Sequence, residues 1–460
     1  MSRTIFKPRA IIRLGAVFDG RGAPDSAPLL LDVEPRNFTV GRNGMHEADT
    51  FSLDIDAKLL PFDPDQIASL ACDIYLWDDV VAGTGVLGFK PMIQDNEMIV
   101  GLADDNGITL DKDDQVIKIT GRDYTAVLHD KEWDPAHSGS GGMVPSGKLL
   151  PDQVQEIADE AAPKTSRARF EVVWKPDEAP PICGGIHRSS KSKGQWVKQG
   201  KSYWDVIYEL CIDHGYVAQI RRDQIIISNP QTETAESLAQ SPRLVYGKHL
   251  SKLEINRKWG RKKVPQLVMR GWNPYTEKFF EIIYPPVRNQ VVDGLAVLKD
   301  DREYVPAPKG VVDEAALLRY LKARFYWSGR GETTYSFSTS NLYIDDPKGG
   351  PEINLMQLRE GNAIGVGFDP FNEQVLRAFT DTGQRTEYII GLGFQPKVAA
   401  FIANNFERMG LFNQDYYYAR GNISYDAADG VELDFEAVNF AHEVREVHFA
   451  EINAEIATEI

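Results

Sequence analysis

The amino-acid sequence predicts a mainly β protein with α+β insertions, in which two strand-rich regions flank a small α/β module. Three observations lead to this fold class. Short runs of alternating polar and apolar residues, separated by turn residues, occupy both ends of the chain. A helix with a clear start and end, followed by a hairpin, lies between them. Short strands at regular intervals are typical of a sandwich or a barrel.

The first strand-rich region covers residues 1–134. Phe51, Leu53 and Ile55 alternate with polar residues, which is the period of a half-buried strand. Further strands are expected at 74–77, 86–89, 98–102 and 116–119. Glycines and the pair Asn106–Gly107 supply the turns. Residues 66–70 are expected to form one short helical turn.

The α/β module covers residues 135–244 and begins with a glycine-rich loop. Its best-defined helix is expected at 202–214, because Ser202 is a suitable N-cap and Gly215 is placed to end the helix. Another helix is expected at 151–162. Strands are expected at 170–174, 216–220 and 224–228.

The second strand-rich region covers residues 245–300 and 341–460, with a helical insertion at 301–340. Apolar residues at helical spacing predict a helix over 313–327. A short helix is expected near 398–409. Strands are expected at 253–255, 266–272, 278–284, 333–337, 341–344, 363–368, 416–425 and 431–440.

Composition narrows the class of protein. The chain has 460 residues, enough for about three domains. Three cysteines argue against a disulfide scaffold and fit a reducing cytoplasm. No stretch approaches the roughly 18 apolar residues of a membrane span, so no membrane anchor is expected. A net charge of −16 argues against stable nucleic-acid binding but is compatible with DNA passing nearby.

Two glycine-rich motifs are similar to nucleotide-binding loops, but each lacks a required part. Residues 83–88 have the GxGxxG spacing, yet the segment after them alternates like a strand instead of opening a helix. Residues 142–148 approach a phosphate-binding loop, yet Leu149 stands where Ser or Thr would hold magnesium. We expect a glycine-rich hairpin and a flexible loop, and we assign no cofactor or cofactor-binding residue.

Two segments of the sequence partly match metal-binding patterns, one for zinc and one for calcium. Two cysteines and two histidines have tolerable spacing for zinc: Cys183, His187, Cys211 and His214. Paired zinc knuckles more often use CxxC, and Cys211 lies on the apolar stripe of a predicted helix. Residues 102–113 imitate a calcium loop, but Leu102 occupies the first ligand position, so a β-turn is favoured. We assign no metal ligand, and zinc binding by the four side chains stays an open question at this point.

Catalytic patterns are absent from the sequence. The pairs Asp54/Asp56 and Asp345/Asp346 are more typical of solvated strand edges than of the carboxylates of a glycosidase. There is no GxSxG and no HExxH motif. We therefore name no catalytic residue and expect a protein that is not an enzyme. Two basic clusters, 187–201 and 257–263, are interpreted as a solvated loop and a hairpin tip, with contacts to an acidic partner or passing DNA as the alternative.

Residues 117–133 carry a strand ending in GRDYT, then a short helix and an acidic, aromatic stretch. This segment resembles the hub proteins of phage tail baseplates, a family of tail-tube-like hubs that includes late control protein D. Residues 37–40 and 47–55, which include ADTFSL, are similar to the first tube-like barrel of that family. Residues 199–227 are similar to its inserted module, and 355–364 to a late segment of the form LRxGxxI.

This resemblance implies a structural function. Such hubs form a homotrimer in which each chain carries two tail-tube-like β-barrels, so that three chains present a pseudo-sixfold face. The ring would join the hexameric tail tube protein to a central spike or tip protein, next to other baseplate proteins and the tape measure protein. DNA would pass through transiently without specific binding. The expected location is the virion tail, assembled in the bacterial host cytoplasm.

Two alternatives are kept. One is the hub of another contractile injection system, which shares the barrels but usually carries a long β-helix. The other is a carbohydrate-binding or carbohydrate-processing β-sandwich protein, suggested by the 10% aromatic content and the acidic pairs.

Overall fold

The structure is a computed structural model of the whole chain. It describes residues 8–18, 29–44, 46–60, 67–78, 94–111, 113–133, 143–145, 147–161, 169–183, 194–196, 200–229, 242–246, 250, 252–257, 263–273, 278–286, 291–292, 295–308, 311, 314–328, 333–344, 353–368, 379, 381–405 and 415–438.

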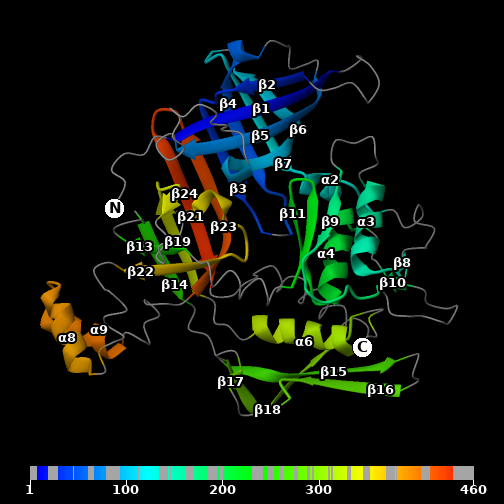
Figure 1. Ribbon diagram of the computed structural model, residues 1–460, viewed down its shortest axis with the longest axis vertical. Helices are drawn as coiled ribbons and strands as arrows, with labels where there is room; N and C mark the ends of the chain where they lie inside the picture. The colour runs from blue at the N-terminus through cyan, green and yellow to red at the C-terminus, as the bar shows by residue number, and fades with distance from the viewer. Residues whose placement is uncertain are drawn as a thin grey trace.

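A sheet of 13 strands forms the largest part of the molecule (Figure 1). Seven of its strands come from the N-terminal region: β1 (Pro8–Phe18), β2 (Leu29–Val33), β3 (Asn37–Arg42), β4 (Thr50–Asp56), β5 (Ile67–Asp78), β6 (Glu97–Asp111) and β7 (Val116–Asp123). The other six come from later in the chain: β13 (Arg243–Tyr246), β14 (Lys252–Arg257), β19 (Thr333–Thr339), β22 (Ala363–Phe368), β23 (Asp415–Asp426) and β24 (Gly430–Val438). The main strand order is β14-β19-β24-β23-β3-β4-β7-β6-β5-β1-β2, and β22 attaches β13 to β23.

The two strand-rich regions meet where β3 pairs with β23. The pairing is antiparallel and aligns Val40 with Ile423 and Phe38 with Tyr425. The rings of Phe38 and Tyr425 stack with their centroids 5.3 Å apart. Strands from opposite ends of the chain are therefore neighbours in one sheet.

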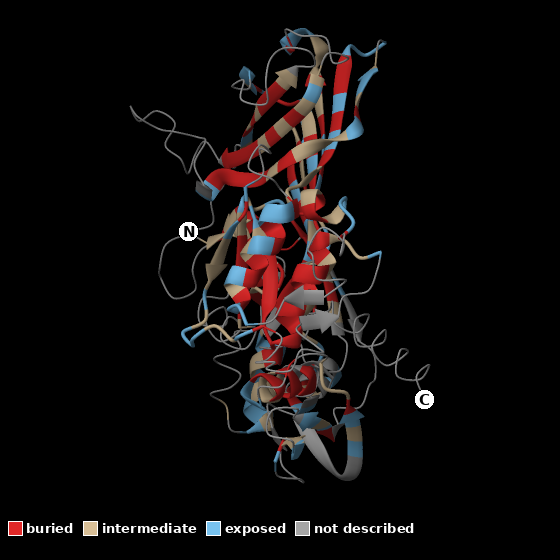
Figure 2. Cartoon of the chain, turned by 90° about the vertical axis from the view of Figure 1, so that its right-hand side faces the viewer, coloured by how far each residue is buried: buried red, intermediate tan, exposed pale blue. Residues whose placement is uncertain are grey.

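Alternation in the sequence decides which face of the sheet is buried. Phe51, Leu53 and Ile55 of β4 are buried, and the polar residues between them are exposed or half-buried. β24 repeats the pattern, with Leu433 and Phe435 buried. The apolar faces from both regions contribute to a single hydrophobic cluster. Figure 2 shows this alternation as buried and exposed segments along the strands.

The α/β module lies beside the sheet (Figure 1). Three helices belong to it: α2 (Thr125–His129), α3 (Leu150–Ala161) and α4 (Tyr203–Asp213). Its small sheet has the order β11-β12-β9, from β9 (Glu171–Trp174), β11 (Val217–Arg221) and β12 (Gln224–Ser228). A short ribbon pairs β8 (Met143–Pro145) with β10 (Gly194–Trp196).

α4 has the predicted boundaries because its cap chemistry is local. The Ser202 side chain accepts a hydrogen bond from the Asp205 N–H, and the Asp205 carboxylate accepts from the Ser202 N–H in return. Gly215 ends the helix with φ +84°, where an added Cβ would lie 2.9 Å from Cβ of Arg319. Only glycine adopts that conformation in that space without strain.

A second, four-stranded sheet packs against the module. It has the order β16-β15-β18-β17, from β15 (Lys263–Asn273), β16 (Lys278–Tyr284), β17 (Val291–Val292) and β18 (Leu295–Val305). α6 (Glu314–Ser328) lies between this sheet and the module (Figure 1). Leu267 and Leu317 share a hydrophobic cluster with Trp204, so these elements form one core.

The remaining elements are short or peripheral. β20 (Tyr343–Ile344) pairs with β21 (Ile353–Asn354). Three single turns are η1 (Ala57–Leu59), η3 (Gln94–Asn96) and η4 (Leu355–Gln357). α8 (Thr382–Gly391) and α9 (Pro396–Asn405) form a hairpin that stands apart from the sheet (Figure 1). No helix within the described ranges is long and apolar enough to span a membrane.

The mainly β fold class is confirmed. Among the described strands, no pairing closes either strand set into a barrel, and both belong to one sheet path. The domain boundaries stay predictions, but five strands pair differently from the predicted grouping. β15, β16, β17 and the first part of β18, assigned to the second barrel, belong to a separate four-stranded sheet. β19, assigned to the helical insertion, pairs with β24.

Three local predictions differ from the structure. The helical turn expected at 66–70 is wrong, because β5 begins at Ile67. The turn at Asn106–Gly107 is also wrong, because both residues lie inside β6, at an irregularity in its pairing with β7. α8 was not predicted. The strand expected at 86–89 lies outside the described residues.

Candidate functional site

The GRDYT segment joins the sheet to the α/β module, and each of its first three residues has a structural task. A Cβ added to Gly121 would lie 2.2 Å from the Leu102 carbonyl oxygen and 2.4 Å from the Phe51 ring. β7 therefore packs at a distance that only glycine allows. Arg122 then ties β6 to the end of α2, because Nε donates to Asp104 at 2.7 Å and both Nη atoms donate to Asp130 at 2.9 and 2.8 Å.

Asp123 begins the turn into α2. Its carboxylate accepts hydrogen bonds from the Thr125 N–H at 3.1 Å and the Thr125 hydroxyl at 3.2 Å. Its own N–H donates to the Asp49 carbonyl oxygen at 2.9 Å. Burial, and then the charge of Asp49, raise the pKa of the Asp123 carboxyl to about 8. The carboxyl group is therefore largely protonated at neutral pH.

The loop between β3 and β4 brings a buried ion pair next to this turn. Nη1 of Arg42 donates to Asp49 at 3.0 Å, and the two side chains are 4% and 16% exposed. Nη2 of Arg42 donates to the Met98 carbonyl oxygen. The other carboxylate oxygen of Asp49 accepts from the Asn43 N–H at 2.8 Å. A buried, paired and hydrogen-bonded charge of this kind fixes the local geometry.

The same loop contacts the module through His46. Its Nε2 lies 2.8 Å from a carboxylate oxygen of Asp205, the residue that caps α4. Its carbonyl oxygen accepts from Nε1 of Trp204 at 3.0 Å and lies 2.6 Å from Nε2 of His129. Burial alone would raise the pKa of Asp205, but hydrogen bonds from His46 and Ser202 dominate and lower it well below its usual range.

A second ion pair connects the sheet and the module at Glu97. Arg222, in the turn between β11 and β12, donates through Nε and Nη2 to the two carboxylate oxygens of Glu97. The backbone of Arg222 is in the left-handed conformation, with φ +57°, and in this turn its side chain reaches Glu97. Bidentate arginine–carboxylate pairs are strong and directional, so the pair sets the position of the hairpin.

The segment after β21 approaches the same place from the C-terminal half of the chain. Asn354 and Gln357 each donate to the Asp95 carbonyl oxygen at 2.8 Å. Arg359 follows, and its Nη1 donates to two carbonyl oxygens of its own segment, those of Met356 and Leu358, at 3.1 and 2.9 Å. Burial, and then the nearby Arg42 charge, lower the pKa of Arg359 to about 9.

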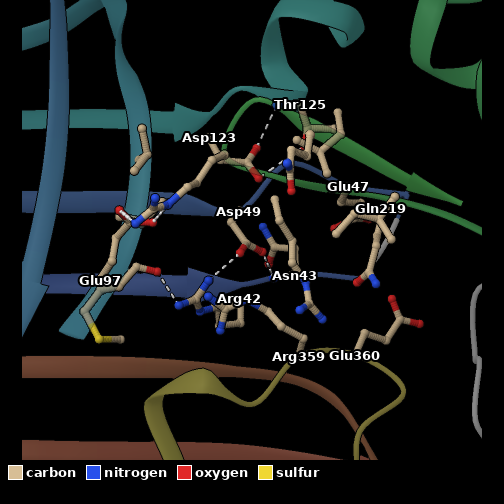
Figure 3. A pocket seen from close by; sticks show the side chains of 18 of the residues that line it. Arg42, Asn43, Glu47, Asp49, Glu97, Asp123, Thr125, Gln219, Arg359 and Glu360 are labelled. Atoms are coloured by element: carbon tan, nitrogen blue, oxygen red, sulfur yellow. Dashed lines mark hydrogen bonds and ion pairs between the residues drawn. The ribbon is translucent and has the colours of Figure 1, made fainter. Parts of the chain in front are cut away.

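These groups surround a pocket of about 300 Å³ that we call the junction pocket (Figure 3). Its walls come from the end of β3 and the loop before β4, the start of β6, the turn from β7 into α2, the residue after β9, the β11–β12 hairpin and the segment 357–360. Charged and amide side chains dominate the lining: Arg42, Asn43, Glu47, Asp49, Glu97, Asp123, Lys175, Gln219, Arg221, Arg222, Gln224, Gln357, Arg359 and Glu360.

The junction pocket lies between two large hydrophobic clusters of the described residues. One cluster belongs to the 13-stranded sheet, and the other to the module with α6 and the four-stranded sheet. Across the pocket the two parts meet through ion pairs and hydrogen bonds. The arrangement can hold the two parts in a defined orientation and can accept a polar ligand.

The predicted metal and cofactor motifs are not assembled into a site in the described ranges. Cys183, Cys211 and His214 are buried, and His187 lies outside those ranges. Nδ1 of His214 lies 2.8 Å from the Leu210 carbonyl oxygen of its own helix. No group of three His, Cys, Asp or Glu side chains suited to a metal ion is found among the described residues.

The other motifs have ordinary structural places where they are described. Residues 83–88 and 345–346 lie outside the described residues, as do most of the two basic clusters. Residues 143–145, expected as a loop, form β8. Most of 102–113 belongs to β6. Asp54 accepts from Asn37 and Asp56 from Arg36, so both carboxylates are engaged on the sheet surface.

Sequence reasoning missed the junction pocket. Its residues come from six segments, and no short motif unites them. One signal was present: Asp123, which lines the pocket, stands between a predicted strand and a predicted short helix.

Comparison with solved structures identifies the class of fold. The tail protein from Neisseria meningitidis MC58 is similar with a TM-score of 0.50, at 10% identity, over 94% of this chain and 96% of that one. Prophage MuSo2 43 kDa tail protein from Shewanella oneidensis aligns over 93% of this chain and 98% of that one, at 13% identity and a TM-score of 0.48. The prophage tail protein gp18 from Listeria monocytogenes EGD-e aligns over 98% and 99%, at 11% identity and a TM-score of 0.46.

The chain therefore has the fold of that Neisseria tail protein, in agreement with the resemblance found in the sequence. No family model matches the sequence. No curated protein matches it either.

Proposed function

We propose that this protein is a structural hub subunit of a phage tail, located in the baseplate or tail tip. Three copies would form a ring that joins the tail tube protein to the central spike protein. The observation that carries the proposal is the single sheet in which β3 of the N-terminal region pairs with β23 of the C-terminal region. Two strand sets side by side in each chain give six sets in a trimer, which matches a sixfold tube.

One face of this sheet supports the same role. A row of polar residues crosses seven strands in register: Arg122, Thr50, Gly41, Asn422, Asp434, Ser338 and Lys252. A parallel row crosses five strands: Thr120, Ser52, Thr39, Ser424 and Glu432. The first row also contains Gly41 and the cations Arg122 and Lys252, whereas the second row presents only hydroxyl groups and a carboxylate, most of them exposed. A wall without cations does not hold a polyanion, so the second row is suited to line a channel for DNA.

The proposed role is structural, with no catalytic centre. In the junction pocket the carboxylates of Asp49 and Glu97 are committed to arginines, and that of Asp123 to Thr125. General acid–base chemistry needs a carboxyl group within reach of a substrate and free to exchange its proton with it. The other baseplate proteins and the tape measure protein are further proposed partners.

The mass of the purified protein in solution tests the ring. Light scattering coupled to size exclusion is expected to give three times the 51.5 kDa of one chain. Negative-stain images of the same peak are expected to show threefold particles with a central opening. A strict monomer at micromolar concentration, or a dimer, contradicts the proposal.

A further inference from the structure

We propose that the junction pocket binds a small oxyanion, a phosphate or a carboxylate, through the guanidinium of Arg359 and the side-chain amide of Gln219. The proposal does not depend on the hub function. It rests on the donors that face the pocket, on the balance of charge around them and on the size of the cavity, about 300 Å³.

The guanidinium of Arg359 has N–H donors that the described residues do not engage. Its Nη1 donates to the carbonyl oxygens of Met356 and Leu358, which fixes the guanidinium plane. Among the described residues, none accepts a hydrogen bond from Nε or Nη2 of Arg359, and none forms an ion pair with it. An arginine carries five N–H donors in a fixed fork that fits the two oxygens of a carboxylate or phosphate.

Gln219 supplies a neutral donor from another wall of the pocket. It lies on β11, is only 7% exposed and faces the pocket (Figure 3). Its side-chain amide makes no hydrogen bond with the part of the chain that the structure describes. The residue as a whole is mostly buried, but its amide group opens into the pocket, where a ligand or ordered solvent can complete its hydrogen bonds.

The charges around Arg359 favour an anion over a cation. Asp49 is engaged by Arg42, and Glu97 is engaged by Arg222. Asp123 holds its proton at neutral pH, because burial and the charge of Asp49 raise its pKa to about 8. Asp49 offsets part of the positive charge, but burial and then repulsion from Arg42 outweigh it and lower the pKa of Arg359.

Two further carboxylates limit the ligand. Glu47 and Glu360 also line the pocket. They disfavour a large or highly charged anion and leave room for one small oxyanion beside the guanidinium. We therefore expect weak but saturable binding, with one site in each chain.

Isothermal titration calorimetry of the full chain with inorganic phosphate tests the site, with sodium chloride used to hold the ionic strength constant. We expect saturable heat with one site per chain. Arg359→Gln is expected to weaken phosphate binding at least about tenfold, because charge-assisted hydrogen bonds are the strong ones. Gln219→Leu is expected to weaken it less. The control, Arg270→Gln, changes an arginine that is 55% exposed on β15 and is expected to leave binding unchanged.

Acetate in the same titration separates the two sources of the ligand chemistry. Competition by acetate assigns the site to carboxylates as well as phosphate, and its absence assigns it to phosphate. The proposal is overturned if wild-type protein gives no saturable heat with either anion. It is also overturned if both pocket variants, folded by circular dichroism, bind phosphate as tightly as wild type.

Discussion

Arg222 donates to both carboxylate oxygens of Glu97 across the boundary between the β11–β12 hairpin and the 13-stranded sheet. The two residues are 125 positions apart in the chain. Glu97 is 10% exposed and Arg222 is 38% exposed, so the pair is partly shielded from solvent. Because the apolar clusters on either side are separate, this pair gives the two parts of the molecule a fixed polar contact.

Replacing Glu97 with Gln is expected to loosen the contact between the sheet and the module. The change leaves Arg222 without its counter-charge and should lower the free energy of unfolding by about 1–3 kcal/mol, between the values typical of exposed and buried pairs. Hydrogen–deuterium exchange should rise in the β11–β12 hairpin before it rises in β3 or β4.

The matched control is Glu281→Gln, which breaks an ion pair with Arg270 on an exposed sheet face, where the side chains are 40% and 55% exposed. Because solvent screens this pair, its loss should cost less than the loss of the Glu97 pair. The prediction is contradicted if both variants lose the same free energy of unfolding. It is also contradicted if hydrogen–deuterium exchange in the β11–β12 hairpin of Glu97→Gln is unchanged, because the ion pair would then not stabilise the hairpin.

Local chemistry explains which elements were predictable. The boundaries of α4 followed from Ser202 and Gly215, because a cap and a left-handed terminator act within a few residues of the helix end. The strand β4 was predictable from the alternation of Phe51, Leu53 and Ile55, which is also a local pattern. The prediction of a helical turn at 66–70 was wrong, because a short apolar run is equally compatible with a strand and a helical turn.

Long-range pairing explains what was not predictable. The contact of Thr39 with Ser424 joins residues 385 positions apart, and neither sequence segment carries a mark of its partner. The junction pocket has the same property, since Arg42, Gln219 and Arg359 reach it from three separate segments. From the sequence, a charged residue at a strand end is expected to be exposed to solvent. Only the fold shows that Arg42 is 4% exposed.

Gly121→Ala is expected to be strongly destabilising. The new methyl group would lie 2.2 Å from the Leu102 carbonyl oxygen and 2.4 Å from the Phe51 ring, so β7 must move away from β6. A loss of about 2 kcal/mol or more in the free energy of unfolding is expected from overpacking at a rigid site. Urea denaturation followed by circular dichroism measures it.

Gly391→Ala is the control for that substitution. A Cβ at this position, the last residue of α8, has no atom within 4 Å. Alanine should leave stability unchanged or raise it by less than about 1 kcal/mol through helix propensity. If Gly121→Ala is as mild as Gly391→Ala, the close approach of β7 and β6 is not as the structure shows it.

Asp123 should make the protein less stable as the pH rises toward alkaline values. Burial, and then the Asp49 charge, raise the pKa of its carboxyl to about 8 in the folded protein, whereas an aspartic acid in an unfolded chain titrates near pH 4. Between about pH 4 and 8 the folded state therefore binds more protons than the unfolded state. Its contribution to stability is fully present below about pH 4 and is lost as the pH rises through about 8.

Asp73 acts in the same direction over a narrower range, because burial, and then the Glu97 charge, raise its pKa to about 6. Urea denaturation of wild type and Asp123→Asn at pH 5, 7 and 9 separates the two. We expect the stability of wild type to fall across the whole range and that of Asp123→Asn to fall less between pH 7 and 9, because Asn carries no titrating proton. Parallel curves for the two proteins would mean that Asp123 titrates at its ordinary pH and that the junction does not retain its proton.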